Sequence, residues 1–491
     1  MFTIGIDLGT SAVKLLLVDQ KGEIVKSETR EYPIYYPHDK WSEQNPEDWW
    51  NACTDGLRAL IADVDKNEIA GIGAGGQMHG LVILDEFDNV IRPAILWNDG
   101  RTEEETRYLN EVVGRDVLAK FTGNVAFAGF TAPKIMWLKK HEIENFKKIK
   151  KIMLPKDYVN YKLTGVFASD YSDAAGTLLL DVNAKRWSEE MLKICDIDID
   201  KMPTLFESAD IIGKVCASAA LKTGLSENTI VVAGAGDNAA AAIGTGCVKE
   251  GDCNISLGTS GTIFIPSDNY LSGEGEKLHF FAHANGKYHL MGCILSAASA
   301  NKWFCDNVLA TNDYQAEQNK IDAEKLGENN VFFLPYLMGE RSPINDVAAR
   351  GVFVGMTAAT SRADMVQAVL EGVSFALRDC LEVAKERGVT VKSSTLCGGG
   401  AKSELWQIIL ANVLNIPLDL LATEQGPGYG AALLALCACG VYNGIDECVS
   451  NLIKYRQRVL PNAELARKYQ NRYDIYKKIY PSMKNLFKEM K

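Results

Sequence analysis

The sequence predicts an α/β protein made of two similar halves that face a shared cleft. Two observations carry this prediction. Strand and helix patterns alternate along most of the chain, which is the order expected of α/β folds. One unusual turn, Leu-Gly-Thr-Ser, also occurs twice inside apolar runs, beginning at Leu8 and again at Leu257. Internal duplication is the simplest explanation of two matching turns in matching surroundings.

The first half opens with a predicted hairpin. An apolar strand ends at Leu8, Gly9–Ser11 form the turn, and "AVKLLLVD" continues as a second strand. Lys21-Gly22 supplies the next turn before the alternating "EIVKSET", so a third strand is expected there. A helix should follow, with Asn45 as its N-cap and Pro46 at its first helical position.

Glycine-rich strand ends recur further along the chain. "IAGIGAGG" is a short buried strand that runs into Met78-His79, and "TIVVAGAGDNAAAAIG" is a strand followed by a helix that opens near Asp237. The second half repeats this order of strands, glycine turns and helices. "CNISLGTSGTIFI" is again strand, turn and strand, and "RADMVQAVLEGVSFALRDCLEVAKERG" has a long helical pattern. "STLCGGG" is a strand that runs into three glycines, and the helix "AKSELWQIILANVLN" follows it. We place the boundary within the glycine-rich stretch at 244–250, which gives two domains, 1–245 and 246–491.

Composition excludes several classes of protein. A net charge of −11 argues against nucleic-acid binding, which needs a basic footprint. No window approaches 18 uninterrupted apolar residues, and the N-terminus lacks the pattern of a signal peptide, so we expect a cytoplasmic protein without a membrane helix. The 12 cysteines contain no Cys-x-x-Cys pair and there are only 6 histidines; a zinc site is therefore not expected.

The two Leu-Gly-Thr-Ser turns are the first candidates for binding. A glycine after a strand, followed by two hydroxyl residues, exposes successive backbone N–H groups that can hold phosphate oxygens. Hairpin turns also use these residues for geometry alone. One copy in each half nevertheless favours two loops that close on one nucleotide from opposite sides.

Two carboxylates stand beside these glycine-rich turns. Asp7 interrupts the strand "IGIDLG"; it either bonds the N–H groups of the turn or lies near phosphates with Mg²⁺ between them. Asp237 opens the Ala-rich helix, where it is either a plain N-cap or a base that accepts a proton from an alcohol attacking a γ-phosphate. The carboxyl end of a strand is where α/β proteins bind ligands.

Three further motifs have both a binding and a structural interpretation. The glycines 398–400 lack the Walker A ending and provide either a flat approach for an adenine or a helix-entry turn. His79, between glycines, either bonds a polar substrate or is structural. Trp97, in the loop "WNDGR", either covers a sugar face or packs its own turn.

With these motifs in view, the chain resembles the FGGY carbohydrate kinases along nearly its whole length. "GFTAPKIMWLKKH" from Gly129 looks like the first signature of that family, and "GVFVGMTAATSRADMVQAVLE" from Gly351 looks like the second. The resemblance implies two duplicated domains of the actin/hexokinase type, which is ribonuclease H-like, around a central cleft. "GQMHG", "WNDGR", "LPKDYVNYKLTG" and "SDAAGTLLLDV" look most like the members that phosphorylate D-xylulose.

The resemblance also implies roles for particular residues. Asp237 matches the catalytic base and a sugar contact, Asp7 matches the acidic residue of Mg-ATP chemistry, which would hold Mg²⁺ through water, and Met78 and His79 match the pair that contacts the ketose. The nucleotide would be held by two phosphate loops and an adenine motif: Gly9, Thr10, Ser11 and Lys14; Gly258, Thr259 and Ser260; and Gly399, Gly400 and Ala401.

The resemblance leaves substrate and assembly open. ATP and D-xylulose are the expected partners, with L-ribulose, gluconate or an alditol as alternative acceptors and a non-catalytic actin-like protein as a distant alternative. A second copy of the chain, forming a homodimer, is a further candidate partner. Two stretches depart from the pattern of the D-xylulose members, at Ser342 and Ile344 and at Gly428-Tyr429, and both could alter loops around the nucleotide half.

Overall fold

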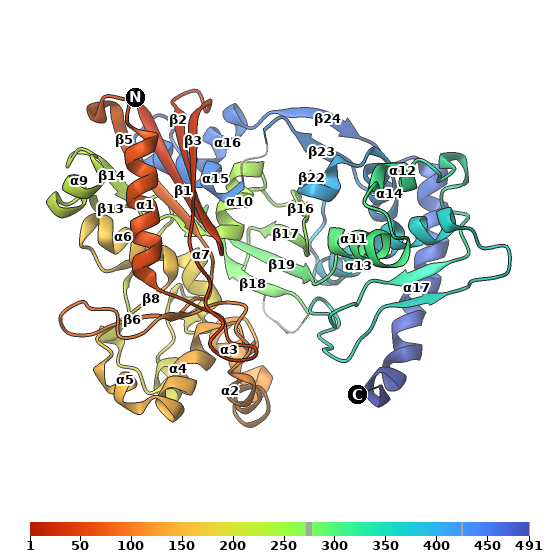
Figure 1. Cartoon of the computed structure of the whole chain (residues 1–491), viewed down its shortest axis with the longest axis horizontal. Coiled ribbons are helices and arrows are strands. Elements are labelled where there is room, and N and C mark those ends of the chain that lie inside the picture. The colour runs from red at the N-terminus through yellow and green to blue at the C-terminus, as the bar shows by residue number, and fades with distance from the viewer. Residues whose placement is uncertain (272–276, 424–425, 491) are drawn as a thin grey trace.

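Two lobes, each built on a seven-stranded mixed sheet, make up the computed structural model, which describes residues 1–271, 277–423 and 426–490 (Figure 1). The first lobe carries the red to yellow-green elements of Figure 1 and the second carries the green to blue elements. Among the described residues, no helix is both long and apolar enough to cross a membrane.

The first sheet begins with the hairpin that the sequence predicts. β1 (Phe2–Leu8), β2 (Ala12–Asp19) and β3 (Ile24–Glu31) pair antiparallel in succession. β5 (Ile69–Gly76) then pairs parallel to β1, and β14 (Ile230–Val232) pairs parallel to β5. Two short strands complete the sheet, the antiparallel edge strand β13 (Ile211–Lys214) and β15 (Ala235–Gly236), which pairs with β5 beyond β14.

The second sheet repeats this order strand for strand. β16 (Asn254–Leu257), β17 (Gly261–Ser267) and β19 (Tyr288–Ile294) pair antiparallel, while β22 (Ser394–Cys397) and β23 (Leu418–Leu421) follow parallel to β16. β18 (His279–Ala282) and β24 (Tyr455–Val459) add antiparallel edges. The predicted duplication is therefore confirmed, because three antiparallel and two parallel strands recur with the same connections.

Short strand pairs and helices surround the two sheets. The strand pairs are β4 (Glu43–Gln44) with β7 (Ala94–Ile95), β6 (Val82–Leu84) with β8 (Lys151–Met153), β9 (Ala168–Asp170) with β12 (Thr204–Phe206), β10 (Leu180–Asp181) with β11 (Arg186–Trp187), and β20 (Phe332–Leu334) with β21 (Val352–Val354).

The helices of the first lobe are α1 (Pro46–Leu60), α2 (Glu103–Tyr108), α3 (Arg115–Thr122), α4 (Thr131–His141), α5 (Ile143–Lys148), α6 (Pro155–Thr164), α7 (Tyr171–Ala174), α8 (Glu189–Cys195), α9 (Ala217–Thr223) and α10 (Asp237–Thr245).

The helices that follow in the sequence belong to the second half of the chain. They are α11 (Ala298–Trp303), α12 (Tyr314–Gln318), α13 (Arg362–Glu386), α14 (Glu404–Leu414), α15 (Gly426–Ala438), α16 (Ile445–Leu452) and α17 (Ala463–Glu489). The helix signals read from the sequence are confirmed at α1, where the Asn45 side chain accepts a hydrogen bond from the Glu47 N–H and Pro46 is the first helical residue. The long helix predicted in the second half is α13.

One helix of the second half packs on the sheet of the first. α15 lies against β1, β5 and α10, and in Figure 1 it appears in blue beside the red strands of the first lobe. Glycines permit this close approach, because a Cβ at Gly5 would lie 1.8 Å from the Gly428 carbonyl oxygen. Tyr429 also donates a hydrogen bond of 2.9 Å to the Gly22 carbonyl. The departure at Gly428-Tyr429 thus lies at this contact between halves, while the boundary at 245/246 stays a prediction.

Candidate active site

The two Leu-Gly-Thr-Ser turns follow matching strands of the two sheets. The first turn comes directly after β1, where the Gly9 N–H donates to the Ala12 carbonyl at 3.0 Å. Side chains hold its carbonyl groups: Tyr32 donates to Gly9, and Gln44 Nε2 donates to Thr10 at 2.7 Å. The second turn comes directly after β16, and the Thr259 carbonyl accepts a 2.7 Å hydrogen bond from Ser299 Oγ.

Asp7 and Asp237 lie at the same edge of the first sheet because of strand register. Asp7 pairs across from Gly75 of β5 on one side, and Ala235 of β15 pairs across from the same Gly75 on the other. Asp237 begins α10 immediately after β15. The carboxyl ends of parallel strands therefore bring together two acidic residues that are separated by most of the first half of the chain.

Burial makes both carboxylates hard to ionise. Burial and the nearby charge of Asp237 raise the pKa of Asp7 to about 7, while Lys14 on the neighbouring strand opposes that rise. Burial raises the pKa of Asp237 to about 6, against the hydrogen bonds from Asn238. Two carboxylates that repel each other across one space form a donor set suited to a hard divalent cation.

Asp237 does not act as a plain N-cap. The N-cap position of α10 is occupied by Gly236, and Asp237 is the first helical residue. Its Oδ1 accepts hydrogen bonds from the Asn238 backbone N–H at 2.7 Å and from Asn238 Nδ2 at 2.8 Å. No described residue donates to Oδ2, which leaves that oxygen available to accept a proton.

Met78 lies beside Asn238 and Gly236, the two neighbours of Asp237 in the chain, and Met78 and His79 both lie against Gly176. Met78 Sδ is 4.0 Å from Asn238 Nδ2. His79 has a left-handed backbone with φ of 69°, and its Nδ1 lies 2.6 Å from the Gly176 carbonyl oxygen. Burial lowers the pKa of His79 to about 3, so its ring is neutral. Because a carbonyl only accepts, Nδ1 carries the proton and Nε2 is left to accept from a hydroxyl group.

The loop "WNDGR" divides into an exposed part and a buried part. The Trp97 indole is 39% exposed and donates to Thr10 Oγ1 at 3.0 Å, so it lies against the first turn. Asp99 and Arg101 form a buried ion pair at 2.7 Å, and the Arg101 guanidinium lies 3.6 Å from the centre of the Trp41 ring. Within this loop, only Trp97 and its neighbour Asn98 face solvent.

The three glycines of the second half lie against the second turn. Gly398 has φ of 92°, and a Cβ there would be 2.8 Å from the Leu257 carbonyl carbon. A Cβ at Gly400 would be 2.9 Å from the Leu257 side chain, whereas nothing lies within 4 Å of one at Gly399. Gly399–Lys402 form a short 3₁₀ helix in which Ala401 is buried. The close packing brings this motif to the end of β16.

A cavity of about 340 Å³ lies between the two lobes and is lined by Asp237 and by Gly398 of the glycine motif. Its volume is within the range of small-molecule sites. From the first lobe it is lined by α10 and from the second lobe by the strand ends and the start of α15, and its lining residues include Asp237, Asn238, Thr245, Ser256, Thr262, Phe264, Cys397, Gly398 and Pro427. A ligand in this cavity would touch both halves of the chain.

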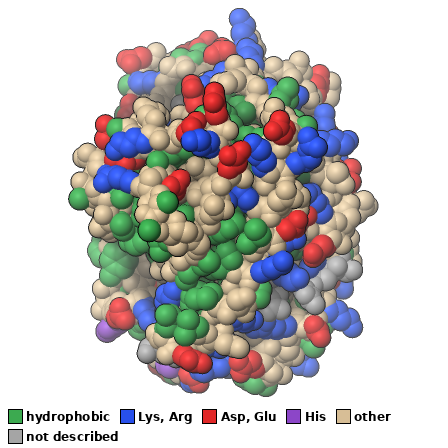
Figure 2. All heavy atoms as spheres, turned by 90° about the vertical axis from the view of Figure 1, so that its right-hand side faces the viewer, with side chains coloured by type: hydrophobic (Ala, Val, Ile, Leu, Met, Phe, Trp, Pro, Cys, Tyr) green, Lys and Arg blue, Asp and Glu red, His purple; other side chains and the backbone are tan. Residues whose placement is uncertain are grey.

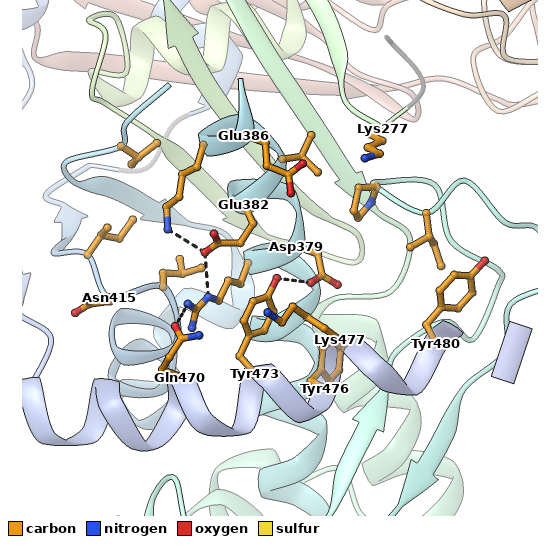
Figure 3. Close-up of a pocket in the computed structure, with 18 of the residues that line it drawn as sticks. Lys277, Asp379, Glu382, Glu386, Asn415, Gln470, Tyr473, Tyr476, Lys477 and Tyr480 are labelled. Carbon is orange, nitrogen blue, oxygen red and sulfur yellow. Dashed lines mark hydrogen bonds and ion pairs between the residues drawn. The ribbon is translucent and has the colours of Figure 1, made fainter. Parts of the chain in front are cut away.

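A larger cavity lies elsewhere, between α13 and α17. It measures about 1190 Å³, and Figure 3 shows Asp379, Glu382 and Glu386 of α13 beside Gln470 and Tyr473 of α17, where the Tyr473 hydroxyl donates to Asp379 at 2.7 Å. None of the predicted site residues lines this cavity. We therefore assign the chemistry to the smaller cavity, because Asp237 and Gly398 line it, whereas Asp7 and the two Leu-Gly-Thr-Ser turns are not among its lining residues.

Sequence reasoning missed Asn238 and Gly176. Asn238 donates two hydrogen bonds to the Asp237 carboxylate, and the Gly176 carbonyl fixes the tautomer of His79. A Cβ at Gly176 would lie 2.6 Å from the His79 ring. The position of Asn238 directly after Asp237 was a signal that could have been used, but nothing in the sequence links Gly176 to a histidine so far away.

Comparison with known families covers both halves. Residues 2–244 match the N-terminal domain of the FGGY family of carbohydrate kinases, and residues 253–439 match the C-terminal domain of the same family. The xylulose kinase of Escherichia coli (strain K12) is 42% identical over 98% of this chain and 99% of its own.

Solved structures share the whole architecture. The crystal structure of a xyloylose kinase from Brucella ovis is 40% identical, with a TM-score of 0.94 over 99% of this chain and 100% of its own. A gluconate kinase from Lactobacillus acidophilus is 26% identical, also with a TM-score of 0.94, over 100% of this chain and 99% of its own. The same fold therefore occurs in proteins named for different sugars.

Proposed function

Because this chain belongs to the FGGY family of carbohydrate kinases, we propose that it transfers the γ-phosphoryl group of ATP to D-xylulose. The products are ADP and D-xylulose 5-phosphate. Full-length similarity to curated xylulose kinases supports the choice of sugar. The observation that carries the proposal is the position of Asp237, which lines the cavity between the lobes and whose neighbours Gly236 and Asn238 lie against Met78.

Asp237 is the proposed general base. Its Oδ2 accepts the proton of the terminal sugar hydroxyl as that oxygen forms a bond to the γ-phosphorus of ATP, and the bond from that phosphorus to the β,γ-bridging oxygen breaks to release ADP. Little covalent chemistry falls to the protein in such a transfer. Holding the hydroxyl and the phosphoryl group in line therefore supplies most of the acceleration.

The glycine-rich turns are the proposed nucleotide site. The turn at Gly9–Ser11 with Lys14 and the turn at Gly258–Ser260 would hold the phosphate groups through backbone N–H groups and hydroxyls. The motif Gly399–Ala401 would take the adenine, and the open space around Gly399 leaves room for a flat ring. Both turns follow the equivalent strands β1 and β16 of the two sheets.

Asp7 is the proposed ligand of Mg²⁺, through water. The residues present fit this ion, because Asp7 offers a buried carboxylate near a second one and Mg²⁺ prefers oxygen donors while keeping several waters. When bound, the ion neutralises charge on the β- and γ-phosphate groups. Asp7 itself would orient the water ligands of the ion.

The sugar would lie against Met78, His79 and Trp97. Neutral His79 presents Nε2 as an acceptor for a sugar hydroxyl, Met78 supplies an apolar contact, and the exposed face of Trp97 can cover a C–H face. Gluconate, L-ribulose or an alditol stays the alternative acceptor. A protein with the same fold that is named a gluconate kinase supports keeping this alternative. Specificity in such a site depends on a few hydrogen bonds.

The test is ADP release with Mg-ATP against D-xylulose, L-ribulose, gluconate, glycerol and no sugar, with Asp237→Asn as the matched control. Strong preference for D-xylulose that the variant loses would support both the sugar and the base. Preference for another sugar would move the proposal to that acceptor. Sugar-independent ADP release, unchanged in the variant, would overturn the assignment as a sugar kinase, whereas no ADP release with any acceptor would favour a non-catalytic actin-like role.

Two wider expectations accompany the proposal. We keep the cytoplasm as the proposed site of the reaction and a second copy of the chain as a proposed partner. Figure 2 shows hydrophobic side chains gathered on the face of the molecule that lies on the right-hand side of Figure 1. Sedimentation velocity over a range of protein concentrations would show whether the chain self-associates.

A further inference from the structure

A buried cluster of one lysine and three aspartates lies beside the proposed base. Lys156 of α6 is 2.7 Å from Asp157, 3.0 Å from Asp170 at the end of β9, and 3.9 Å from Asp173 of α7. All four side chains are at most 1% exposed. The proposed mechanism uses none of them, although they occur in the motifs "LPKDYVNYKLTG" and "SDAAG".

This cluster holds both ends of the short segment that leads to Asp237. At the first end, Lys156 Nζ donates to the Ala233 carbonyl at 3.1 Å, and Asn160 Nδ2 donates to the same oxygen at 2.9 Å. At the second end, the Gly236 N–H donates to Ser172 Oγ at 3.1 Å. Ser172 Oγ in turn donates to Asp170 Oδ2, which is bound to the cluster through Lys156.

The segment needs such support because of its own sequence. Gly234 and Gly236 flank Ala235, and Gly234 has φ of 76°. Glycine loses more conformational freedom on folding than any other residue, so a Gly-Ala-Gly segment does not hold the next side chain in one place by itself. A fully buried ionic cluster is also weak evidence of stabilisation, since apolar replacements of such groups are often as stable or more so.

We propose that Ser172, oriented by Asp170 and Lys156, is a positioning residue that fixes the peptide preceding Asp237 and thereby the direction of the Asp237 carboxylate. The inference rests on the proposed role of Asp237 as the base and adds a residue that positions this base. The Ser172 hydroxyl makes two hydrogen bonds and thus acts as a relay. It accepts one from the Gly236 N–H, next to the base, and donates the other to Asp170, which is paired with Lys156.

The charges around the relay agree with this role. Burial raises the pKa of Asp173 well above its usual value, and the charges of Asp157, Asp170 and Asp237 raise it further against the effect of Lys156. Neither carboxyl oxygen of Asp173 has a hydrogen-bond partner among the described residues, and Lys156 lies nearer to Asp157 and Asp170 than to Asp173.

Ser208 provides a matched control. Ser208 Oγ donates to the same Asp170 Oδ2 at 2.9 Å and is 2% exposed, but its side chain does not touch Gly236. Ser172→Ala and Ser208→Ala thus remove equivalent bonds to Asp170, and only the first removes the acceptor for the Gly236 N–H. We expect similar melting temperatures for the two variants.

The kinetic result should separate them. Ser172→Ala should lower kcat by roughly 10- to 100-fold, because small misplacements of a reacting group have effects of that size, while KM for ATP and for the sugar changes by less than about twofold. Ser208→Ala should keep kcat near that of the wild type. Equal losses of kcat in the two variants, or a loss confined to KM, would overturn the inference.

A double-variant comparison connects the effect to the base. If Ser172 acts through Asp237, Ser172→Ala should cause no further loss in an Asp237→Asn protein. Multiplying losses would overturn the inference. Full turnover in Asp237→Asn alone would instead overturn the proposed base and the inference with it, whereas an inactive Asp237→Asn beside a normal Ser172→Ala would overturn the inference alone.

A second variant covers the case in which Ser172→Ala does not fold. Ser172→Thr keeps the hydroxyl that accepts from Gly236 and donates to Asp170. We expect it to retain kcat within about threefold of the wild type. A folded Ser172→Thr protein, checked by its circular dichroism and melting temperature, that has lost kcat as severely as Asp237→Asn would overturn the inference.

Discussion

At the scale of single residues, the site depends on polar groups that are held in states they would not have in water. Asp237 and Asp7 are half-buried carboxylates with raised pKa values, and His79 is a half-buried neutral imidazole with a lowered one. Perturbed groups of this kind cluster at functional sites. Each of them yields a prediction that can be measured.

The pH dependence of turnover should follow Asp237. Burial raises the pKa of Asp237 to about 6, and a base must be ionised to accept a proton, so kcat/KM for the sugar should fall about tenfold per pH unit below about pH 6. The measurement is kcat/KM at saturating Mg-ATP from pH 5 to 9. A flat profile down to pH 5 would contradict the assignment of this carboxylate as the base.

The stability of Asp237→Asn should run in the opposite direction to its activity. The folded pKa of about 6 exceeds the unfolded value, so above pH 6 both states are ionised and the folded state bears the cost of a buried charge. The neutral variant should therefore be more stable at pH 8, by up to about 3 kcal/mol, since each unit of pKa shift corresponds to about 1.4 kcal/mol. Urea unfolding at pH 8 and pH 4 would show this gain, which should shrink at pH 4.

His79→Asn should weaken sugar binding selectively. Asparagine tolerates the left-handed backbone of this position, with φ of 69°, but removes the ring that presents Nε2. Losing one hydrogen bond should raise KM for the sugar by roughly 5- to 30-fold and leave KM for ATP unchanged. His141→Asn, at a histidine whose side chain is 43% exposed, is the control, and equal KM values in both variants would remove His79 from the sugar site.

At the scale of elements, glycines decide which segments touch. β1, β5 and α15 approach through backbone atoms, because a Cβ at Gly73 would lie 2.1 Å from the Ala431 carbonyl oxygen and one at Gly5 would lie 1.8 Å from that of Gly428. Thr3 Oγ1 donates to the Ala432 carbonyl at 3.2 Å across the same contact. The same contact reaches Asp7, because a Cβ added at Gly428 would lie 3.3 Å from the Asp7 Cβ.

Gly5→Ala should therefore destabilise the protein strongly. A methyl group cannot fit 1.8 Å from a carbonyl oxygen, so β1 and α15 must separate, at a cost of about 1 to 3 kcal/mol or more. The midpoint of urea unfolding measures this. Gly213→Ala in β13, where the nearest atoms would be at 3.4 Å, is the matched strand control and should stay within about 0.5 kcal/mol of the wild type; equal midpoints would refute the tight contact.

Elements were the part of the fold that sequence patterns predicted best. The hairpin β1–β2, the N-cap of α1 and the helix after the Gly-Ala-Gly turn are all local features, set by residues a few positions apart. The partner of α15 was not predictable in this way. The sequence of α15 is apolar on all sides of the helix. Its hydrophobic periodicity therefore does not show which face packs against a sheet, or which sheet that is.

At the scale of the whole molecule, the lobes meet at the sugar end of the cleft as well as at α15. Asn124 of the first lobe donates through Nδ2 to the Phe280 carbonyl at 2.7 Å and accepts from the Phe280 N–H at 3.0 Å. The His79 and Phe281 rings lie 6.3 Å apart across the same junction. The cavity thus lies between two lobes that contact each other near the proposed sugar site.

We predict that the lobes rotate toward each other when sugar and nucleotide are both bound. Closure would exclude water, which could otherwise accept the phosphoryl group. Small-angle scattering of Asp237→Asn with Mg-ATP and D-xylulose should show a smaller radius of gyration than the free protein, without turnover during the measurement. Unchanged scattering with both ligands, at concentrations that saturate binding, would contradict closure.

The sequence by itself determined the class of fold, the duplication, the family resemblance and the residues nearest to the chemistry. These depend on local patterns, namely glycine turns after strands, helix caps and signatures whose members are adjacent in the chain. Asp7, Met78, His79 and Asp237 could be named for this reason.

Only the tertiary structure decided which distant groups meet. Strand register places Asp7 and Asp237 on either side of β5, and packing places Gly176 against His79, Ser172 against Gly236, and α15 on the sheet of the other half. Such contacts join residues far apart in the sequence, and their energies depend on the burial and geometry of the folded chain, which no local pattern encodes.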